Sequence, residues 1–401
     1  MVGRLTEDAL LILIAGALLA TGVLASLVAV RLRLPALVLF LGLGMLIGTD
    51  GLGWFDFENY ELTRLIGSIA LLLILFEGGL AAGFDAIRPV LRPAISLAII
   101  ATIGTALIVG IAATVLFDLP LLEAFLLGAV LSGTDGAAVF ALLRGSRLRS
   151  DLARTLEGEA GLNDPIAVLL VLASIELLTQ PEYGALDVLL FYIQELGIGA
   201  VIGVVMGLVG ANCLRALKAA PPSLNLVTSF ATAAIAYGAA GALHGSGFLA
   251  VYLAGLALGS VDFPAKPSVD AFHEGLAAVA EIGMFFALGL LVFPSQLDRN
   301  LLESTLLALI VAFIARPLAA AAATAFEHFS ARDHLLLGWT GLRGAVPVIL
   351  ATFPVIEGIP RSLEFFNVVF FAVLVSTLIQ GSTVETLANR LGCTEKAAAA
   401  N

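Results

Sequence analysis

The stretch EGEAGLNDPIAVLL, residues 157–170, decides the fold, because it carries charged and amide side chains within an otherwise apolar run. Glu159 and Asn163 are four residues apart and share one face of a helix, and Asp164 follows directly. Pro165 lacks an N–H, and its ring clashes with the carbonyl four residues earlier. We therefore predict a helix broken at Pro165, with a free carbonyl near a carboxylate. These are the oxygens that a hard monovalent cation prefers.

The composition around this stretch is that of a membrane protein. Hydrophobic residues make up 60% of the 401 residues, with 41 glycines in addition, and charged residues only 13%. Soluble domains are about 45–50% apolar with glycine included, and about a quarter charged. We therefore expect a polytopic, all-α membrane protein and not a soluble enzyme. The net charge of −11 also argues against a nucleic-acid partner.

Cysteine and histidine provide no sign of a bound cofactor. The two cysteines predict neither a disulfide framework nor a metal cluster. The four histidines lie at or near apparent loops and predict no histidine-ligated metal. We expect no cofactor.

Apolar runs separated by charged or Gly/Pro-rich segments predict about 13 transmembrane helices. They lie near residues 8–30, 35–49, 62–82, 94–117, 121–143, 152–179, 185–211, 224–243, 246–260, 271–293, 302–325, 333–356 and 364–389.

The basic residues predict the orientation, because Lys and Arg are enriched in cytoplasmic loops. With the N-terminus outside, 14 of the 20 Lys and Arg residues fall in internal segments and four in external ones. The other two, Arg316 and Arg343, lie within predicted spans. We expect an inner-membrane protein with the N-terminus outside and the C-terminus in the cytoplasm.

Two further motifs predict broken helices. SGTDGAAVF, residues 132–140, places Thr134 and Asp135 between Gly133 and Gly136 in mid-membrane. Glycine tolerates unwound backbone, and short polar side chains can satisfy its N–H groups.

TGLRGAVPV, residues 340–348, repeats this pattern 208 residues later, with Gly341 and Gly344 in the glycine positions. The two spans run in opposite directions, which is typical of an inverted-repeat transporter with its site at the midplane.

Ionisable groups inside spans are costly, and each is a candidate for function or for a structural pair. They are Glu77, Asp135, Glu159, Asp164, Glu281, Arg316 and Arg343, and for Glu281 we favour a structural or peripheral role. For Asp164 we favour a binding role. For Glu159 we favour a structural charge pair with Arg316 or Arg343, and the sequence does not choose between them.

These motifs, with FEGGL at 76–80 and IARP at 314–317, resemble the NhaP/NHE branch of the cation/proton antiporter superfamily over nearly the whole chain. The resemblance implies an NhaA-like antiporter fold, a homodimer, and exchange of K⁺ or Na⁺ for H⁺. It makes Asp164 the titrating carboxylate that binds the cation, with Asn163, Thr134, Asp135 and Glu77 around it. Sodium-selective members often have serine where this chain has Ala160, which argues against a sodium preference.

The resemblance also implies two structural units and a short tail. The interface unit for dimerisation comprises residues 1–91 and 181–300, the transport core comprises 92–180 and 301–391, and the cytoplasmic tail is 392–401. Competition of a proton and a cation for Asp164, with Asn163 in place of a second acid, predicts electroneutral 1:1 exchange by alternating access. A solute symporter of the same architecture, a cation channel and an intramembrane aspartyl protease are the alternatives.

Overall fold

The computed structural model describes residues 2–32, 35–143, 148–217, 221–263, 265–296 and 300–395. Within these residues every regular element is helical, and the single β-bridge joins Leu148 to Thr394.

The helices of the first half are α1 (Val2–Leu32), α2 (Ala36–Ile47), α3 (Tyr60–Ala82), α4 (Phe84–Ile87), η1 (Arg88–Val90), α5 (Leu91–Ser96), η2 (Leu97–Ala101), α6 (Thr102–Phe117), α7 (Leu121–Ser132), α8 (Gly136–Leu143) and α9 (Ser150–Thr179). The helices of the second half are α10 (Ala185–Ala216), α11 (Pro222–Ala242), α12 (Gly247–Gly259), α13 (Lys266–Leu290), η3 (Pro294–Gln296), α14 (Leu301–Ile310), η4 (Val311–Ala315), α15 (Arg316–Ala323), α16 (Ala331–Trp339), α17 (Ala345–Ile356), α18 (Ser362–Ser376), η5 (Thr377–Gly381) and α19 (Ser382–Leu391).

The predicted multi-span, all-α membrane fold is confirmed. Nine helical stretches among the described residues are long and apolar enough to cross a membrane, and α2, α7, α12 and α17 are shorter apolar helices. Each of them overlaps one of the 13 predicted spans. The fourth span begins at Phe84, ten residues before its predicted start, and α7 and α17 cover only part of the fifth and twelfth spans. Six of the basic residues used to predict the orientation lie outside the described residues: Arg33, Arg144, Arg147, Lys218, Arg299 and Lys396. Most of the predicted tail also lies outside them.

The chain departs from a continuous helix in the fifth and twelfth predicted spans. α7 ends at Ser132 and α8 begins at Gly136, whereas α16 ends at Trp339 and α17 begins at Ala345. The expected break at Pro165 is absent, because α9 continues as one helix through that residue. A proline removes one hydrogen bond of the ladder, and the packing of a long buried helix tolerates that loss.

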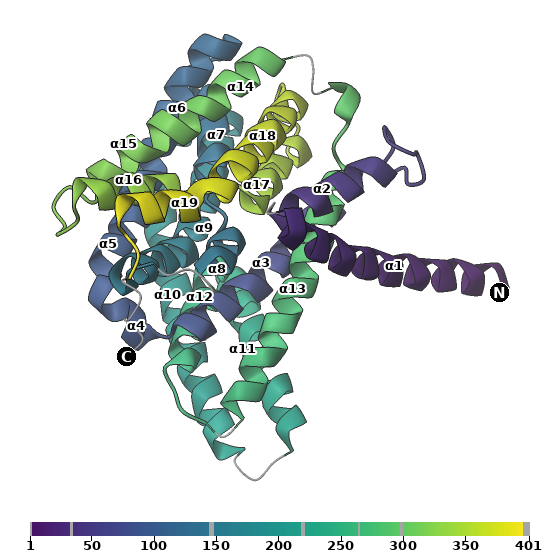
Figure 1. Cartoon of the computed structure of the whole chain (residues 1–401), viewed down its shortest axis with the longest axis vertical. Helices are drawn as coiled ribbons and strands as arrows, with labels where there is room; N and C mark the ends of the chain where they lie inside the picture. Colours follow the sequence, from purple (N-terminus) through teal and green to yellow (C-terminus); the bar gives the residue numbers. More distant parts are fainter. Residues whose placement is uncertain are drawn as a thin grey trace.

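Helices 6, 7 and 14–19 lie in the upper part of the molecule and α10–α13 in the lower part, whereas α1 extends away from the bundle (Figure 1). In the most apolar stretch of each helix, only 17% of α1 and 11% of α10 is buried within the chain. These two helices present apolar surface outward, as lipid-facing helices do.

One histidine is not where the sequence suggested. His273 is fully buried within α13, and its Nε2 lies 2.9 Å from the Ser229 hydroxyl of α11. Its ring also packs on Phe76, with 4.8 Å between ring centroids. His273 is thus part of the packing between helices and does not lie near a loop.

Candidate functional site

The two helix breaks contact each other directly. The Asp135 N–H donates to the Leu342 carbonyl at 2.8 Å, so the unwound segments pair through their backbones. Arg343 Nη1 donates to the carbonyls of Ser132 and Gly133, at 2.6 Å each. A cationic guanidinium therefore lies at the C-terminus of α7, where a helix carries partial negative charge.

Asp135 supplies a negative charge at two helix N-termini, those of α17 and α8. Its Oδ2 accepts from the Ala345 N–H at 3.2 Å, and its Oδ1 accepts from the Ala138 N–H at 3.3 Å. A carboxylate at a helix N-terminus satisfies N–H groups that the helix leaves open and complements its dipole. A Cβ at Gly344 would overlap this carboxylate, so the crossing needs glycine there.

Three side chains of α18 and η5 form hydrogen bonds with backbone groups of Arg343 and Trp339, in and next to the second break. The Arg343 N–H donates to Ser376 Oγ at 3.1 Å, and Thr377 Oγ1 donates to the Arg343 carbonyl at 2.9 Å. Gln380 Nε2 donates to the Trp339 carbonyl at 3.1 Å. Sequence analysis missed these residues, and the only available signal was their polarity within a predicted span.

Asn163 connects α9 to the first break and to α6. Its Nδ2 donates to Thr134 Oγ1 at 2.6 Å, and its Oδ1 accepts from Thr102 Oγ1 at 2.9 Å. All three side chains are buried. This network fixes the Asn163 amide, so it orients the unwound segment toward the helix that carries Asp164.

The Asp164 carboxylate lies on α9 directly after Asn163. It is only 1% exposed, and its Oδ1 has no hydrogen-bond partner among the described residues. Asp135 lies within electrostatic range of it. A buried carboxylate is stable only with a proton, a cation or a charged partner, so Asp164 has the chemistry of a site that exchanges one for another.

Glu159 pairs with Arg316, the choice that the sequence left open. The ion pair joins α9 to α15, and its side chains are 3% and 1% exposed. A Cβ at Gly341 would overlap the Arg316 side chain, so this glycine makes room for the arginine. Glu159 and Arg316 both lie within electrostatic range of Arg343.

Glu77 is buried on α3, a helix that contacts both α8 and α9. The next residue, Gly78, lies under the ring of Phe140 from α8. The structure thus places Glu77 beside the elements that carry the site.

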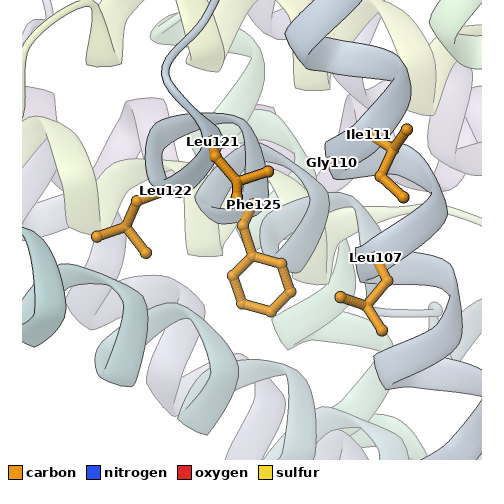
Figure 2. Close-up of a pocket in the computed structure, with 6 residues that line it drawn as sticks. All are labelled: Leu107, Gly110, Ile111, Leu121, Leu122 and Phe125. Atoms are coloured by element: carbon orange, nitrogen blue, oxygen red, sulfur yellow. The ribbon is translucent and has the colours of Figure 1, made fainter. Parts of the chain in front are cut away.

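An apolar pocket between α6 and α7 is separate from these groups. Its lining residues are Leu107, Gly110, Ile111, Leu121, Leu122 and Phe125. Figure 2 shows only carbon atoms in their side chains. No side chain there can hold a cation or a proton.

Two crossed broken helices with a buried carboxylate beside them define the class of inverted-repeat secondary transporters. The comparisons with known proteins specify it further. The chain belongs to the sodium/hydrogen exchanger family, whose transmembrane family model matches residues 15–390. This membership makes it a cation/proton antiporter of the membrane and not an enzyme.

The chain is 41% identical over 388 residues to "K(+)/H(+) antiporter NhaP" of Alkalimonas amylolytica, which covers 95% of this chain and 67% of that protein. It is 40% identical to "K(+)/H(+) antiporter NhaP2" of Shewanella sp. (strain MR-4), covering 94% of this chain and 66% of that one. The chain thus spans about two thirds of the length of these relatives. Its fold is similar to that of the sodium proton antiporter MjNhaP1 from Methanocaldococcus jannaschii, with a TM-score of 0.83, 23% identity, and coverage of 96% and 99% of the two chains.

Proposed function

We propose that the chain exchanges K⁺ for H⁺ by competition at Asp164. The observation that carries the proposal is the buried Asp164 carboxylate with an unpartnered oxygen, next to the crossing of two broken helices. A proton and a dehydrated cation both neutralise this carboxylate, and one displaces the other. Thr134, Asp135, Asn163 and Glu77 surround the cation or hold the surrounding backbone.

The choice of potassium has two supports. The two relatives at about 40% identity are both named K⁺/H⁺ antiporters. Ala160, one turn before Asp164, offers no hydroxyl oxygen to a small cation. A site with fewer protein oxygens favours the ion that is less costly to dehydrate, which is K⁺ over Na⁺.

Glycine contacts support a division into an interface unit (residues 1–91 and 181–300) and a transport core (residues 92–180 and 301–391). Within a unit, glycines allow backbones to touch: a Cβ on Gly79 of α3 would meet the backbone of α12, and one on Gly128 of α7 would meet that of α6. Between the units, every glycine contact among the described residues is with a side chain. These contacts are Gly67 with Ile349, Gly78 with Phe140, Gly158 with Ile87, Gly161 with Tyr252, and Gly381 with Pro35.

This difference in packing suits alternating access. Backbone contacts at glycines join helices at short range and resist sliding, whereas isolated side-chain contacts can be broken and remade. The core is thus able to move against the interface unit while each unit keeps its shape. We further propose that the interface unit forms a homodimer, and that the N-terminus lies outside and the C-terminus in the cytoplasm.

Antiport in proteoliposomes tests the exchange and the choice of cation. With a pH-sensitive dye inside, addition of K⁺, Na⁺, Li⁺ or Rb⁺ in parallel should move protons most rapidly with K⁺. A channel would pass current without proton coupling, and a symporter would move protons in the direction of its solute. Equal or faster proton movement with Na⁺ would overturn the choice of potassium but not the exchange.

A further inference from the structure

Two aromatic rings cross the boundary between the units close to Asp164, and each rests on a glycine of the other unit. Tyr252 of α12, 1% exposed, lies over Gly161 of α9. Phe140 of α8, 7% exposed, lies over Gly78 of α3. A Cβ on either glycine would overlap the ring, so each ring packs where it does because the residue beneath it is glycine.

Both contacts lie on the same side of the site. Gly161 precedes Asp164 by three residues in α9, and Phe140, in α8, follows Asp135 by five residues. At a rise of about 1.5 Å per residue, both are displaced by about one to one and a half turns toward the connection between α8 and α9. The two rings therefore form a layer between the site and that end of the molecule.

At Gly78 and Gly161, the contacts that hold this layer are made by the side chains of Phe140 and Tyr252. α3 and α12 touch through their backbones at Gly79 and Gly255, so Gly78 and Tyr252 move together. The Tyr252 hydroxyl donates to the Glu157 carbonyl at 3.4 Å, a long hydrogen bond that contributes little. The fit of each ring to its glycine is what keeps the layer closed.

We propose that Tyr252 and Phe140 are positioning residues of the transport cycle. Their rings close the route to Asp164 from the α8–α9 end, and they leave Gly161 and Gly78 when the route opens at that end. The inference rests on the proposed exchange by alternating access. The inference identifies the residues that close one end of the route to Asp164. It also gives Gly78 and Gly161 a role, which is to leave space for the two rings.

The test compares the apparent KM for K⁺ on the two faces of oriented proteoliposomes. The added methyl group in Gly161→Ala displaces the Tyr252 ring and so favours the state open toward the α8–α9 end. Apparent affinity scales with the fraction of molecules in the competent state, so KM should fall at that face and rise at the opposite face, by roughly threefold or more. Gly238→Ala is the matched control, since a Cβ at Gly238 in α11 meets no atom within 4 Å. It should leave both values unchanged.

A double-mutant cycle identifies the ring as the cause. In a Tyr252→Ala background, Gly161→Ala should have no further effect on the ratio of the two KM values, and Gly78→Ala should likewise have none in a Phe140→Ala background. Tyr252→Phe keeps the ring and should behave as the unmodified protein. Should Gly161→Ala fail to fold, Tyr252→Ala alone must shift the two KM values in opposite directions.

Equal changes at both faces, or an effect of Gly161→Ala that persists without the Tyr252 ring, would overturn the inference, because a purely structural role predicts them. These outcomes leave the exchange itself standing. Absence of K⁺/H⁺ exchange in the unmodified protein would instead refute the proposed function, on which the inference depends.

Discussion

Asn163 and Asp164 are adjacent and both buried, yet their side chains differ in their hydrogen bonding. The Asn163 amide is engaged through both its oxygen and its nitrogen, whereas one Asp164 oxygen has no partner among the described residues. On the proposed mechanism, the amide fixes the surrounding backbone and the carboxylate exchanges a proton for a cation. α9 carries a second buried acid, Glu159, which is paired with Arg316, and the two acids lead to different predictions.

Asp164→Asn should abolish K⁺-driven proton movement while the protein remains folded. The substitution keeps the volume of the side chain but removes the charge that attracts a cation or takes up a proton. The measurement is dye-monitored antiport, with thermal unfolding in detergent as the check on folding. Asp85→Asn, at an exposed position of α4, is the control and should transport normally. Transport at the unmodified rate by a folded Asp164→Asn protein would refute the mechanism.

Glu159→Ala should destabilise the protein more than it slows transport, because it leaves Arg316 charged and unpaired in the interior. Breaking a buried pair in this way costs roughly 3–5 kcal/mol. Glu157→Ala, on the same helix, removes a partner of Arg154, whose side chain is 38% exposed, and should cost about 1 kcal/mol or less. Thermal unfolding compares the two variants, and equal midpoints would mean that Glu159 does not act as a structural partner.

At the scale of the elements, the crossing is stabilised by complementary charges: Arg343 at a helix C-terminus and Asp135 at helix N-termini. Gly344→Ala should disrupt it, because the added methyl group overlaps the Asp135 carboxylate and forces it from the Ala345 N–H. Loss of such a cap costs roughly 0.5–2 kcal/mol, and we expect at least about a tenfold loss of the initial antiport rate. Gly238→Ala, which adds a methyl group where a Cβ meets no atom within 4 Å, is the control and should leave the rate unchanged. An unchanged rate in Gly344→Ala would show that transport tolerates a displaced Asp135.

The spans and both glycine-bracketed breaks follow from the sequence, since hydropathy and glycine position are local properties. The partners of the charged groups do not follow from it. Arg316 and Arg343 are equally plausible partners for Glu159 in a linear sequence, and only the packing of α9 against α15 selects Arg316. Likewise, Ser376, Thr377 and Gln380 satisfy backbone groups that only the tertiary structure brings near them.

The sequence also did not predict how the start of the tail, after α19, packs against the rest of the chain. Cys393 is 1% exposed, its thiol donates to Asp333 Oδ1 at 3.5 Å, and its carbonyl accepts from the Arg149 N–H at 3.0 Å. Arg149 in turn contacts Asp333, with 3.2 Å between Nη1 and Oδ1. The start of α9, the start of α16 and the chain after α19 are therefore joined at one point.

Burial and the hydrogen bond to Asp333 raise the pKa of the Cys393 thiol to about 11. Maleimides react with the thiolate, which a raised pKa makes scarce at neutral pH. In a Cys213→Ser variant, which lacks the exposed cysteine, folded protein should therefore label negligibly at pH 7–8, with labelling increasing as the pH approaches 11. Unfolded protein should label readily at pH 8. Rapid labelling of the folded variant at pH 8 would show that the junction is open in solution.

At the scale of the whole molecule, the proposed transport movement depends on where glycines pack against backbone and where they pack against side chains. In the proposed division, the glycine contacts with backbone lie within each unit, whereas the glycine contacts between the units are with side chains, one of them at Gly161, three residues before Asp164. On the proposed mechanism, a movement of one unit against the other changes access to Asp164 while the backbone contacts within each unit persist. The charges carried in each step then determine how the membrane potential acts on the cycle.

The last prediction concerns that charge. If Asp164 exchanges one proton for one monovalent cation, each half of the cycle carries the same charge and no net current flows. A membrane potential, worth about 2.3 kcal/mol per charge per 100 mV, then has no effect on the overall equilibrium. On a solid-supported membrane, sustained current should be near zero while dye-monitored antiport proceeds. Asn163→Asp tests the reason, because a second acid is able to carry a second proton and produce a current. A robust steady current from the unmodified protein would mean that another carboxylate, Glu77 first among them, also titrates during transport.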